Sequence, residues 1–354
     1  MVQPVFSPEI AKRNGFDFLR LFFAFSVFMA HFGELAPVTV WWPVSSAMGV
    51  AGFFIISGFL ITRSYYRSAG LRDYCRKRIR RIVPAYVFVV VACALLLSLA
   101  GTLSFQEYFT DRRFYKYLVA NLSFMNFLQP ALPGVFADQP VNGALWTIKV
   151  ELALYAVVPL LALFLRKRPA PVLGAVYILS CLFDRGMSLL YESSGNELYL
   201  ILERQFLGQI RFFVAGIFLL FYFDFITKRH IRWLLPVAAA IFLLRYFFIG
   251  HWMIEALYPI AFAILIVSFA YHFGKLAAVS RYGDFSYGFY LYHFPVLQLF
   301  LGVDWLKNHP ACLFPVCFCT VSGLACLSWH LLEKPILRRN TGYKGAFRNA
   351  ISGE

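Results

Sequence analysis

Three ionisable side chains share one face of the first apolar segment of the sequence. Asp17, Arg20 and His31 lie in a stretch whose other residues are mostly Phe, Leu, Ala and Val. On a helix, Arg20 and His31 lie about 20° apart around the axis, and Asp17 lies within about 60° of both. A charge near the centre of a bilayer costs on the order of 3 kcal/mol, so we expect this face to line a protein interior or a wet cavity. A neutral imidazole there can accept a proton from a hydroxyl group; the alternative is a buried polar network that fixes helix packing.

A second candidate group is the carboxylate of Glu151. Thr147, Glu151 and Tyr155 share one helical face, whereas Lys149 points largely elsewhere. This helix is predicted to run inward, which puts Glu151 about 10 Å below the outer boundary, near the depth expected for His31. A carboxylate at that depth can orient and charge-stabilise the imidazole. The alternative is a structural Glu151 that is bonded to a neighbouring helix.

Basic residues are concentrated between positions 63 and 81. The end of this segment contains Arg76, Lys77, Arg78 and Arg81. If it is helical, residues four apart align and form basic rows at the membrane surface. Guanidinium groups suit phosphate esters because they form paired hydrogen bonds. The alternative is the ordinary excess of basic residues on the inner side of a membrane, in contact with anionic lipid.

Three further polar residues lie within or beside apolar segments. They are Arg211, His293 in the run Tyr292-His293-Phe294-Pro295, and Glu333 before Lys334-Pro335. A lone group of this kind is slightly more often architectural than catalytic. Seven cysteines occur without a CxxC pair, so neither a metal site nor a disulfide framework is expected.

The elements that must position these groups are membrane helices. The 354 residues are 60% hydrophobic and 14% charged, far from the composition of soluble domains. We predict an all-α polytopic bundle of about ten transmembrane helices, each long enough to cross a core of about 30 Å. The predicted spans are 18–35, 44–62, 82–101, 143–165, 171–190, 206–223, 233–250, 255–273, 285–303 and 311–332.

The distribution of basic residues predicts the orientation. Most of the 33 Lys and Arg fall on one side when both termini are cytoplasmic. Residues 1–17 and 334–354 are then short cytoplasmic tails of a single membrane-embedded domain, 1–354, without a cleaved signal peptide. The net charge of +15 indicates topology and contact with membrane lipid, not nucleic acid. The outward segment 102–143 is long enough to form a partial lid or a glycan-facing surface.

Six short motifs, in order along nearly the whole chain, resemble acyltransferase family 3, the integral membrane enzymes that acylate bacterial glycans. The motifs are Asp17-x-Leu-Arg20 with His31, Phe53-Phe-Ile-Ile-Ser-Gly58-Phe-Leu, Arg81-Ile-x-Pro84, Leu145-Trp146-Thr147-x-x-x-Glu151 with Tyr155 and Pro159, Tyr292-His293-x-Pro295, and Ser328 with Glu333-x-Pro335. Lys149, where a small or polar residue is more usual, is a mild departure. The fused periplasmic SGNH-type domain of some relatives is not expected here.

The resemblance implies an O-acetyltransferase in the bacterial inner membrane. Its acyl donor would be acetyl-CoA, without a metal, and its acceptor a hydroxyl of a cell-surface or lipid-linked carbohydrate such as O-antigen (lipopolysaccharide), capsule or exopolysaccharide. His31 and Arg20 are then essential, and Arg76, Arg78 and Arg81 are associated with the donor. We expect His31 to act as general base or to carry the acyl group transiently, and Glu151 to hold the imidazole. Asp17, Trp146, Tyr155, Arg211, His293 and Glu333 support the site, with Arg211 a candidate for the developing oxyanion.

Other functions share these features. A carrier for a lipid-linked sugar or small anion also needs intramembrane ionisable groups, although no inverted repeat is evident. Transfer of succinyl or another acyl group is the alternative within the enzyme class. A sensor or scaffold would leave His31 and Glu151 unexplained.

Overall fold

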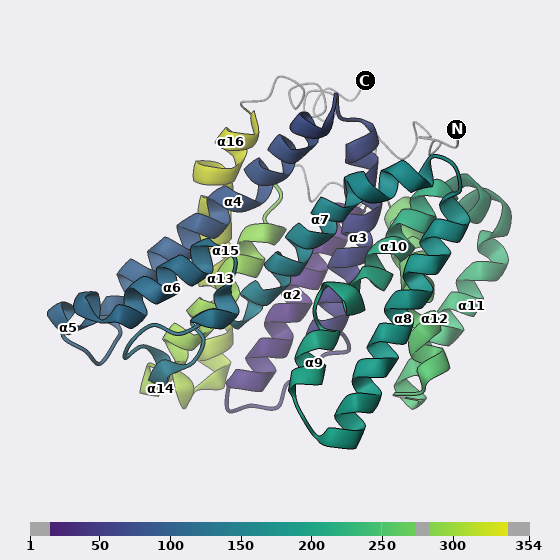
Figure 1. Cartoon of the computed structure of the whole chain (residues 1–354). Helices are drawn as coiled ribbons and strands as arrows, with labels where there is room; N and C mark the ends of the chain where they lie inside the picture. The colour runs from purple at the N-terminus through teal and green to yellow at the C-terminus, as the bar shows by residue number, and fades with distance from the viewer. Residues whose placement is uncertain (1–14, 249, 274–282, 339–354) are drawn as a thin grey trace. The chain divides into compact units, whose positions relative to one another are not determined.

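The computed structural model describes residues 15–248, 250–273 and 283–338. Every regular element in these ranges is helical, which confirms the predicted all-α fold. The α-helices are α2 (Phe16–Leu35), α3 (Ser46–Tyr66), α4 (Leu71–Leu96), α5 (Phe105–Thr110), α6 (Arg112–Leu122), α7 (Trp146–Leu165), α8 (Pro169–Ser194), α9 (Leu198–Glu203), α10 (Phe206–Phe221), α11 (Ile231–Phe247), α12 (Trp252–His272), α13 (Ser286–Leu301), α14 (Asp304–Lys307), α15 (Pro310–Ser328) and α16 (Lys334–Arg338) (Figure 1).

Most of the predicted spans are helices of membrane-crossing length. In the described ranges, eight helical stretches are long and apolar enough to cross a bilayer. The remaining two predicted spans, 233–250 and 285–303, correspond to α11 with 17 residues and α13 with 16. The chain is therefore a multi-pass membrane protein. Most of the two predicted tails lies outside the described residues, but α2 already begins at Phe16 and α16 continues the helix through Lys334–Arg338.

Two compact units are built from interleaved parts of the chain. The first unit takes the described residues of Met1–Arg20, Val50–Tyr74 and Val150–Val279, and the second those of Leu21–Gly49, Cys75–Lys149 and Ser280–Glu354. His31 and the basic rows of α4 belong to the second unit, and Glu151 to the first.

Glycines allow the helices of the first unit to approach closely. A Cβ on Gly58 of α3 would collide with the backbone of Phe213 in α10, and one on Gly216 of α10 would collide with the backbone of Ile55. Small residues of this kind are common where membrane helices touch, because they bring two backbones into van der Waals contact. Gly58, which the sequence pattern singled out, therefore serves helix packing.

In the second unit, the segment predicted as a long outward connection contains two helices. Ser104 and Glu107 cap the start of α5 reciprocally, and Asp111 accepts from the Arg113 N–H at the start of α6. Two buried tyrosine hydroxyls fasten this region to α4: Tyr108 donates to the Ala94 carbonyl at 2.8 Å, and Tyr86 to the Asn121 carbonyl at 2.9 Å. The segment is therefore an ordered part of its unit.

Candidate active site

His31 forms a pair with His293 inside the second unit. His31 Nδ1 lies 2.9 Å from His293 Nε2, and the two ring planes are inclined by only 4°. This geometry is an edge-to-edge hydrogen bond between imidazoles. His31, on α2, is half-buried, whereas His293, on α13, is fully buried. The structure thus brings together two of the predicted site residues that are 262 positions apart.

The backbone fixes which nitrogen carries each proton. His293 Nδ1 lies 2.7 Å from the Tyr290 carbonyl, which can only accept, so this nitrogen is the donor. In the described ranges, His293 contacts a carbonyl, an imidazole and aromatic rings. A fully buried charge without a counter-ion is expensive, so this imidazole is neutral. Its Nε2 then accepts, and His31 Nδ1 donates to it. The lone pair of His31 is left on Nε2, which has no hydrogen-bond partner in the described part of the chain.

Residues just before α7 and in its first turn fix the part of α13 that carries His293. The Asn142 side chain donates to the Leu291 carbonyl at 2.9 Å, and Thr147 Oγ1 lies 2.7 Å from the Tyr290 hydroxyl. Phe294 packs edge-on against His31 at 5.1 Å between ring centroids, and a Cβ on Gly143 would lie 2.7 Å from the Phe294 ring.

Sequence reasoning missed Tyr290 and Asn142 as supports of the pair. Tyr290 stands three residues before His293 on one helix, a spacing at which a side chain can reach a backbone carbonyl. That spacing was the available signal for Tyr290. Asn142 had none beyond its place at the head of the Trp146–Glu151 motif.

Glu151 belongs to a polar cluster of the first unit. Its Oε1 accepts from the Tyr155 hydroxyl and, at 3.3 Å, from the Ser57 hydroxyl. The predicted shared face of Glu151 and Tyr155 is therefore real. A contact between Glu151 and His31 stays a prediction. Trp146 is half-buried at the start of α7, and the Lys149 ammonium lies 4.6 Å from the centre of the Phe127 ring.

The predicted donor-binding arginines all lie on helix α4, which agrees with the helix expected for the basic segment. Their surroundings differ. Arg76 is exposed and Arg78 half-buried. Arg81 pairs with two carboxylates of the second unit, Asp284 at 2.5 Å and Glu333 at 2.9 Å. Its guanidinium also lies 5.6 Å and 5.8 Å from the ring centres of Tyr287 and Trp329.

Three further charged residues of the predicted site can be placed within their own units. Arg211 of α10 forms a buried ion pair with Asp184 of α8, in the first unit. Asp17 and Arg20 lie half-buried in the first two turns of α2. No group of three or more potential metal ligands occurs among the described residues.

Known proteins match the chain over nearly its whole length. A family described as an acyltransferase domain matches residues 13–330. Nodulation protein 10 of Rhizobium leguminosarum bv. viciae is 30% identical over 93% of this chain and 94% of its own length. The O-acetyl transferase of Shigella phage Sf6 is 26% identical over 93% of this chain and 98% of its own length. The O-acetyltransferase OatA of Staphylococcus aureus is 24% identical over 97% of this chain, which spans only 59% of that longer protein. No solved structure matches the chain.

Proposed function

The chain belongs to acyltransferase family 3, and on that premise we propose that it transfers an acetyl group from acetyl-CoA to a hydroxyl of a carbohydrate. The acceptor is a cell-surface or lipid-linked glycan, such as O-antigen, capsule or exopolysaccharide. The relatives from the phage and from Staphylococcus are both named O-acetyltransferases, which supports the acetyl group and the oxygen acceptor. In this proposal the protein lies in a bacterial inner membrane with both termini in the cytoplasm.

The observation that carries the proposal is the uncommitted nitrogen of the histidine pair. His293 holds His31 in the tautomer whose Nε2 has a free lone pair, with its Nδ1–H donated at 2.9 Å. A neutral imidazole of this kind is a competent general base near neutral pH. His293 is here a positioning residue, in the place that a carboxylate occupies in many hydrolases.

The reaction then runs through one base. His31 Nε2 takes the proton of the sugar hydroxyl while the sugar oxygen attacks the thioester carbonyl carbon. The new bond is C–O and the broken bond is C–S, so the products are the acetyl ester and the thiolate of CoA. The imidazolium returns its proton to that thiolate, which restores the neutral pair.

The donor enters from the basic end of α4. Arg76 and Arg78 are the arginines that we propose for the phosphates of CoA, because guanidinium groups recognise phosphate through paired hydrogen bonds. Arg81 stays in this group as a weaker candidate, since its guanidinium is shared with Asp284 and Glu333. Helical periodicity in the sequence predicts one face for Asp17, Arg20 and His31, so we propose that the pantetheine arm follows this face, with Asp17 and Arg20 at its inner end.

Glu151 and Arg211 keep secondary places in the proposal. Glu151, with Tyr155 and Trp146 beside it in sequence, is proposed to stabilise charge near the imidazole. Arg211 is the proposed partner of the oxyanion, although its pairing with Asp184 competes with that role.

Release of free CoA tests the proposal directly. The purified protein in lipid nanodiscs is mixed with acetyl-CoA and a panel of methyl glycosides, and both free thiol and acetylated sugar are measured. We expect His31→Ala to lower transfer by about 10²- to 10⁴-fold, the usual contribution of a general base. The matched control is His309→Ala, an exposed histidine whose Nδ1 also bonds a backbone carbonyl, at 2.7 Å from Trp305 O, and it should keep full activity.

Three outcomes would contradict the proposal or refine its donor. Full transfer by correctly folded His31→Ala would remove His31 from the reaction. Uptake of a sugar into proteoliposomes without CoA release would favour the carrier. Faster release from succinyl-CoA than from acetyl-CoA would replace the acetyl group by the larger acyl group.

A further inference from the structure

A cavity of about 660 Å³ lies beside α6, the longer of the two helices in the segment 102–143. It is lined by one face of this helix, by Ser123 just after it, and by Leu128 and Gln129 farther along the chain. We call it the α6 cavity. Its volume falls within the roughly 300–1,000 Å³ of small-molecule sites. All of its lining residues belong to the second unit, as do His31 and His293.

Two basic side chains line the α6 cavity without a counter-ion. Arg112 and Lys116 both belong to its lining, and at four positions apart on a helix their Cβ atoms are about 5–6 Å from each other. Neither side chain forms an ion pair or a hydrogen bond with the rest of the described chain, whereas the neighbouring Arg113 pairs with Asp111 at 2.9 Å and with Asp138 at 3.3 Å. Like charges at this spacing repel each other. The arrangement is therefore suited to an anion that binds between them.

The charges of the lining favour a diphosphate over a carboxylate. Among its described residues, the α6 cavity has two cations and no Asp or Glu. A diphosphate that links two organic groups carries two negative charges, whereas an acidic sugar carries one. A guanidinium group binds phosphate oxygens through paired hydrogen bonds, and an ammonium group binds them as a point charge.

The surface around the cavity is apolar enough to contact lipid. In the lining, Val119 and Leu128 are 71% and 67% exposed, and the adjacent Phe127 is 60% exposed. In a membrane protein, a helix with basic residues near one end and large exposed apolar residues near the other is typical of the bilayer interface. A ligand can therefore place a diphosphate between the cations and a hydrocarbon tail against this apolar surface.

Hydrogen bonds within the second unit connect the α6 cavity with the histidine pair. Gln129, in the lining, is followed by Pro130, whose carbonyl accepts from the Val141 N–H at 2.9 Å. The next residue, Asn142, donates at 2.9 Å to the backbone carbonyl two positions before His293. The wall of the cavity is thus joined to the segment that holds the imidazoles, as a single acceptor that reaches both places requires.

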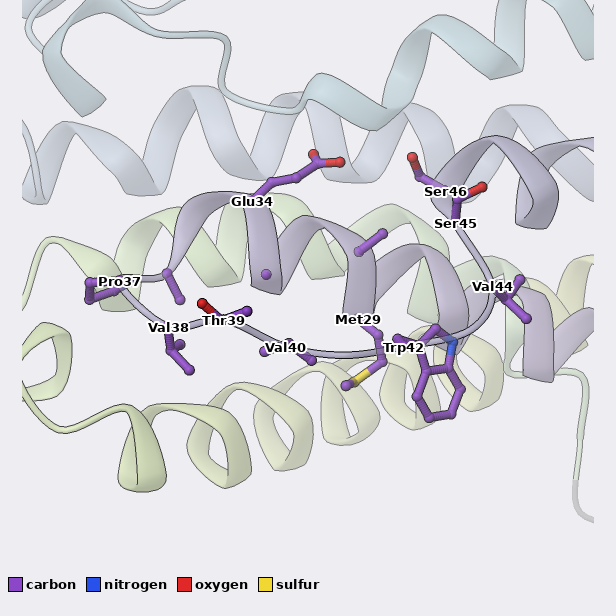
Figure 2. Close-up of a pocket in the computed structure, with 13 residues that line it drawn as sticks. Met29, Glu34, Pro37, Val38, Thr39, Val40, Trp42, Val44, Ser45 and Ser46 are labelled. Atoms are coloured by element: carbon purple, nitrogen blue, oxygen red, sulfur yellow. The ribbon is translucent and has the colours of Figure 1, made fainter. Parts of the chain in front are cut away.

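A second cavity of this unit offers a contrast in charge. It has a volume of about 560 Å³ and lies between the last turns of α2 and the segment that leads to α3 (Figure 2). None of the residues that line it in the described chain is Lys or Arg. Of these two cavities, only the α6 cavity offers positive charge to a diphosphate.

We propose that the α6 cavity binds the diphosphate of a lipid-linked acceptor glycan between Arg112 and Lys116. Phospholipid headgroups also offer phosphate esters, but a phosphodiester carries one negative charge for the two cations. This inference rests on the proposed acyltransferase function for the role of the bound molecule, and it narrows the acceptor to the lipid-linked class.

Direct binding of farnesyl diphosphate tests the site without any acyl transfer. Binding of the tritiated compound to the full chain in phosphatidylcholine nanodiscs is measured against empty nanodiscs. We expect Arg112→Gln with Lys116→Gln to weaken binding about 10-fold, because two charged contacts are lost at an exposed site. Added salt should weaken binding to the wild type more than to this double variant. Farnesol, and dihexanoyl phosphatidylglycerol as a soluble phospholipid, should each compete at least 10-fold more weakly than farnesyl diphosphate.

A matched double variant controls for the loss of positive charge. Arg204→Gln with Lys307→Gln removes two exposed side chains of the same types elsewhere in the chain and should leave binding within 2-fold.

Acyl transfer then tests the role of the bound diphosphate. Transfer from acetyl-CoA is measured for the best sugar of the glycoside panel, once as its methyl glycoside and once as its farnesyl diphosphate conjugate. Arg112→Gln with Lys116→Gln should raise the KM of the conjugate about 10-fold. The KM of the methyl glycoside and both kcat values should change less than 3-fold, which also shows that the double variant is folded.

The two proposals fail on different results. Equal binding by the wild type and by Arg112→Gln with Lys116→Gln, equally strong competition by the phospholipid, or equal KM values for the two forms of the sugar would each overturn this inference and leave the acyltransferase proposal intact. Binding as expected, with no release of CoA in the presence of either form of any sugar of the panel, would count against the acyltransferase proposal and against the role of the lipid as acceptor, and would leave the diphosphate site in place.

Discussion

Helix α13 and the residues just before it take part in two polar clusters of opposite character. At its start, Asp284 shares the Arg81 guanidinium with Glu333, and Ser286 donates to Asp284 at 2.6 Å. Farther along, His293 pairs with His31 and with a backbone carbonyl. The first cluster is centred on ion pairs, and the second is built from neutral groups. Both lie in the second unit.

The two clusters differ in whether a hydrogen-bond donor or acceptor remains available to a substrate. In the Arg81 cluster the cation faces two carboxylates at hydrogen-bonding distance and two aromatic rings, an arrangement that satisfies a buried charge. In the histidine pair each N–H donates one hydrogen bond, and His31 Nε2 has no hydrogen-bond partner among the residues that the structure describes. A polar cluster in a membrane protein can thus fasten helices or present a reactive atom, and the count of uncommitted donors and acceptors tells the two apart.

Removing the charge at the centre of the ionic cluster gives the largest expected effect on stability. Arg81→Leu removes the guanidinium that pairs with Asp284 and with Glu333, whose side chain is 2% exposed. Breaking a buried pair in this way costs about 3–5 kcal/mol. The free energy of unfolding, measured by denaturant titration in micelles, should fall by that amount, and Arg81→Leu with Glu333→Leu should recover part of it.

The exposed Arg76 supplies the control. Arg76→Leu should leave unfolding within about 0.5 kcal/mol. If Arg81→Leu unfolds like the wild type but raises the KM for acetyl-CoA, the cluster is a donor site and the comparison between the two clusters fails.

Replacing the inner histidine of the neutral cluster should act on the reaction and much less on stability. His293→Phe removes the acceptor that holds the His31 Nδ1–H, so the imidazole loses its fixed tautomer. We expect kcat to fall by about 10- to 100-fold, as for other residues that orient a reacting group. His293→Gln offers an amide oxygen to the same N–H and should recover part of the loss.

Rescue by glutamine separates orientation from packing. Phenylalanine is the larger apolar residue and glutamine the better hydrogen-bond acceptor, so a packing role would favour phenylalanine. Higher activity in His293→Phe than in His293→Gln would show that His293 merely fills space.

Much of the fold was predictable because a bilayer restricts which segments can cross it: they must be apolar and long enough to span its core. Apolar length and the cost of charge in a bilayer located the spans without any knowledge of tertiary contacts. The sequence did not predict helices α5 and α6, which lie in the outward segment 102–143. They are 6 and 11 residues long and are fastened to α4 by the hydroxyls of Tyr108 on α5 and Tyr86 on α4, contacts that no local sequence pattern predicts.

The candidate site was predictable by residue type but not by partner. His31 and His293 were each singled out as costly groups in apolar surroundings, and helical spacing paired Glu151 with Tyr155 correctly. The contact between His31 and His293 depends on how α2 and α13 pack, which spacing within one helix cannot supply. Arg81 shows the same limit, because its carboxylate partners lie more than 200 positions away in the sequence.

The smallest predicted effect concerns Tyr290, whose backbone carbonyl and side-chain hydroxyl make different contacts. Tyr290 offers its backbone carbonyl to His293 Nδ1, and its hydroxyl lies 2.7 Å from Thr147 Oγ1 and 3.1 Å from the Ala144 carbonyl. Tyr290→Phe removes only the hydroxyl, so it should cost about 0.5–1.5 kcal/mol of unfolding free energy while kcat stays within 2-fold. The tautomer of the pair is set by the carbonyl, which this change leaves in place. A fall in kcat comparable to that of His293→Phe, at unchanged stability, would mean that the phenol takes part in the reaction and that the neutral cluster extends beyond the two imidazoles.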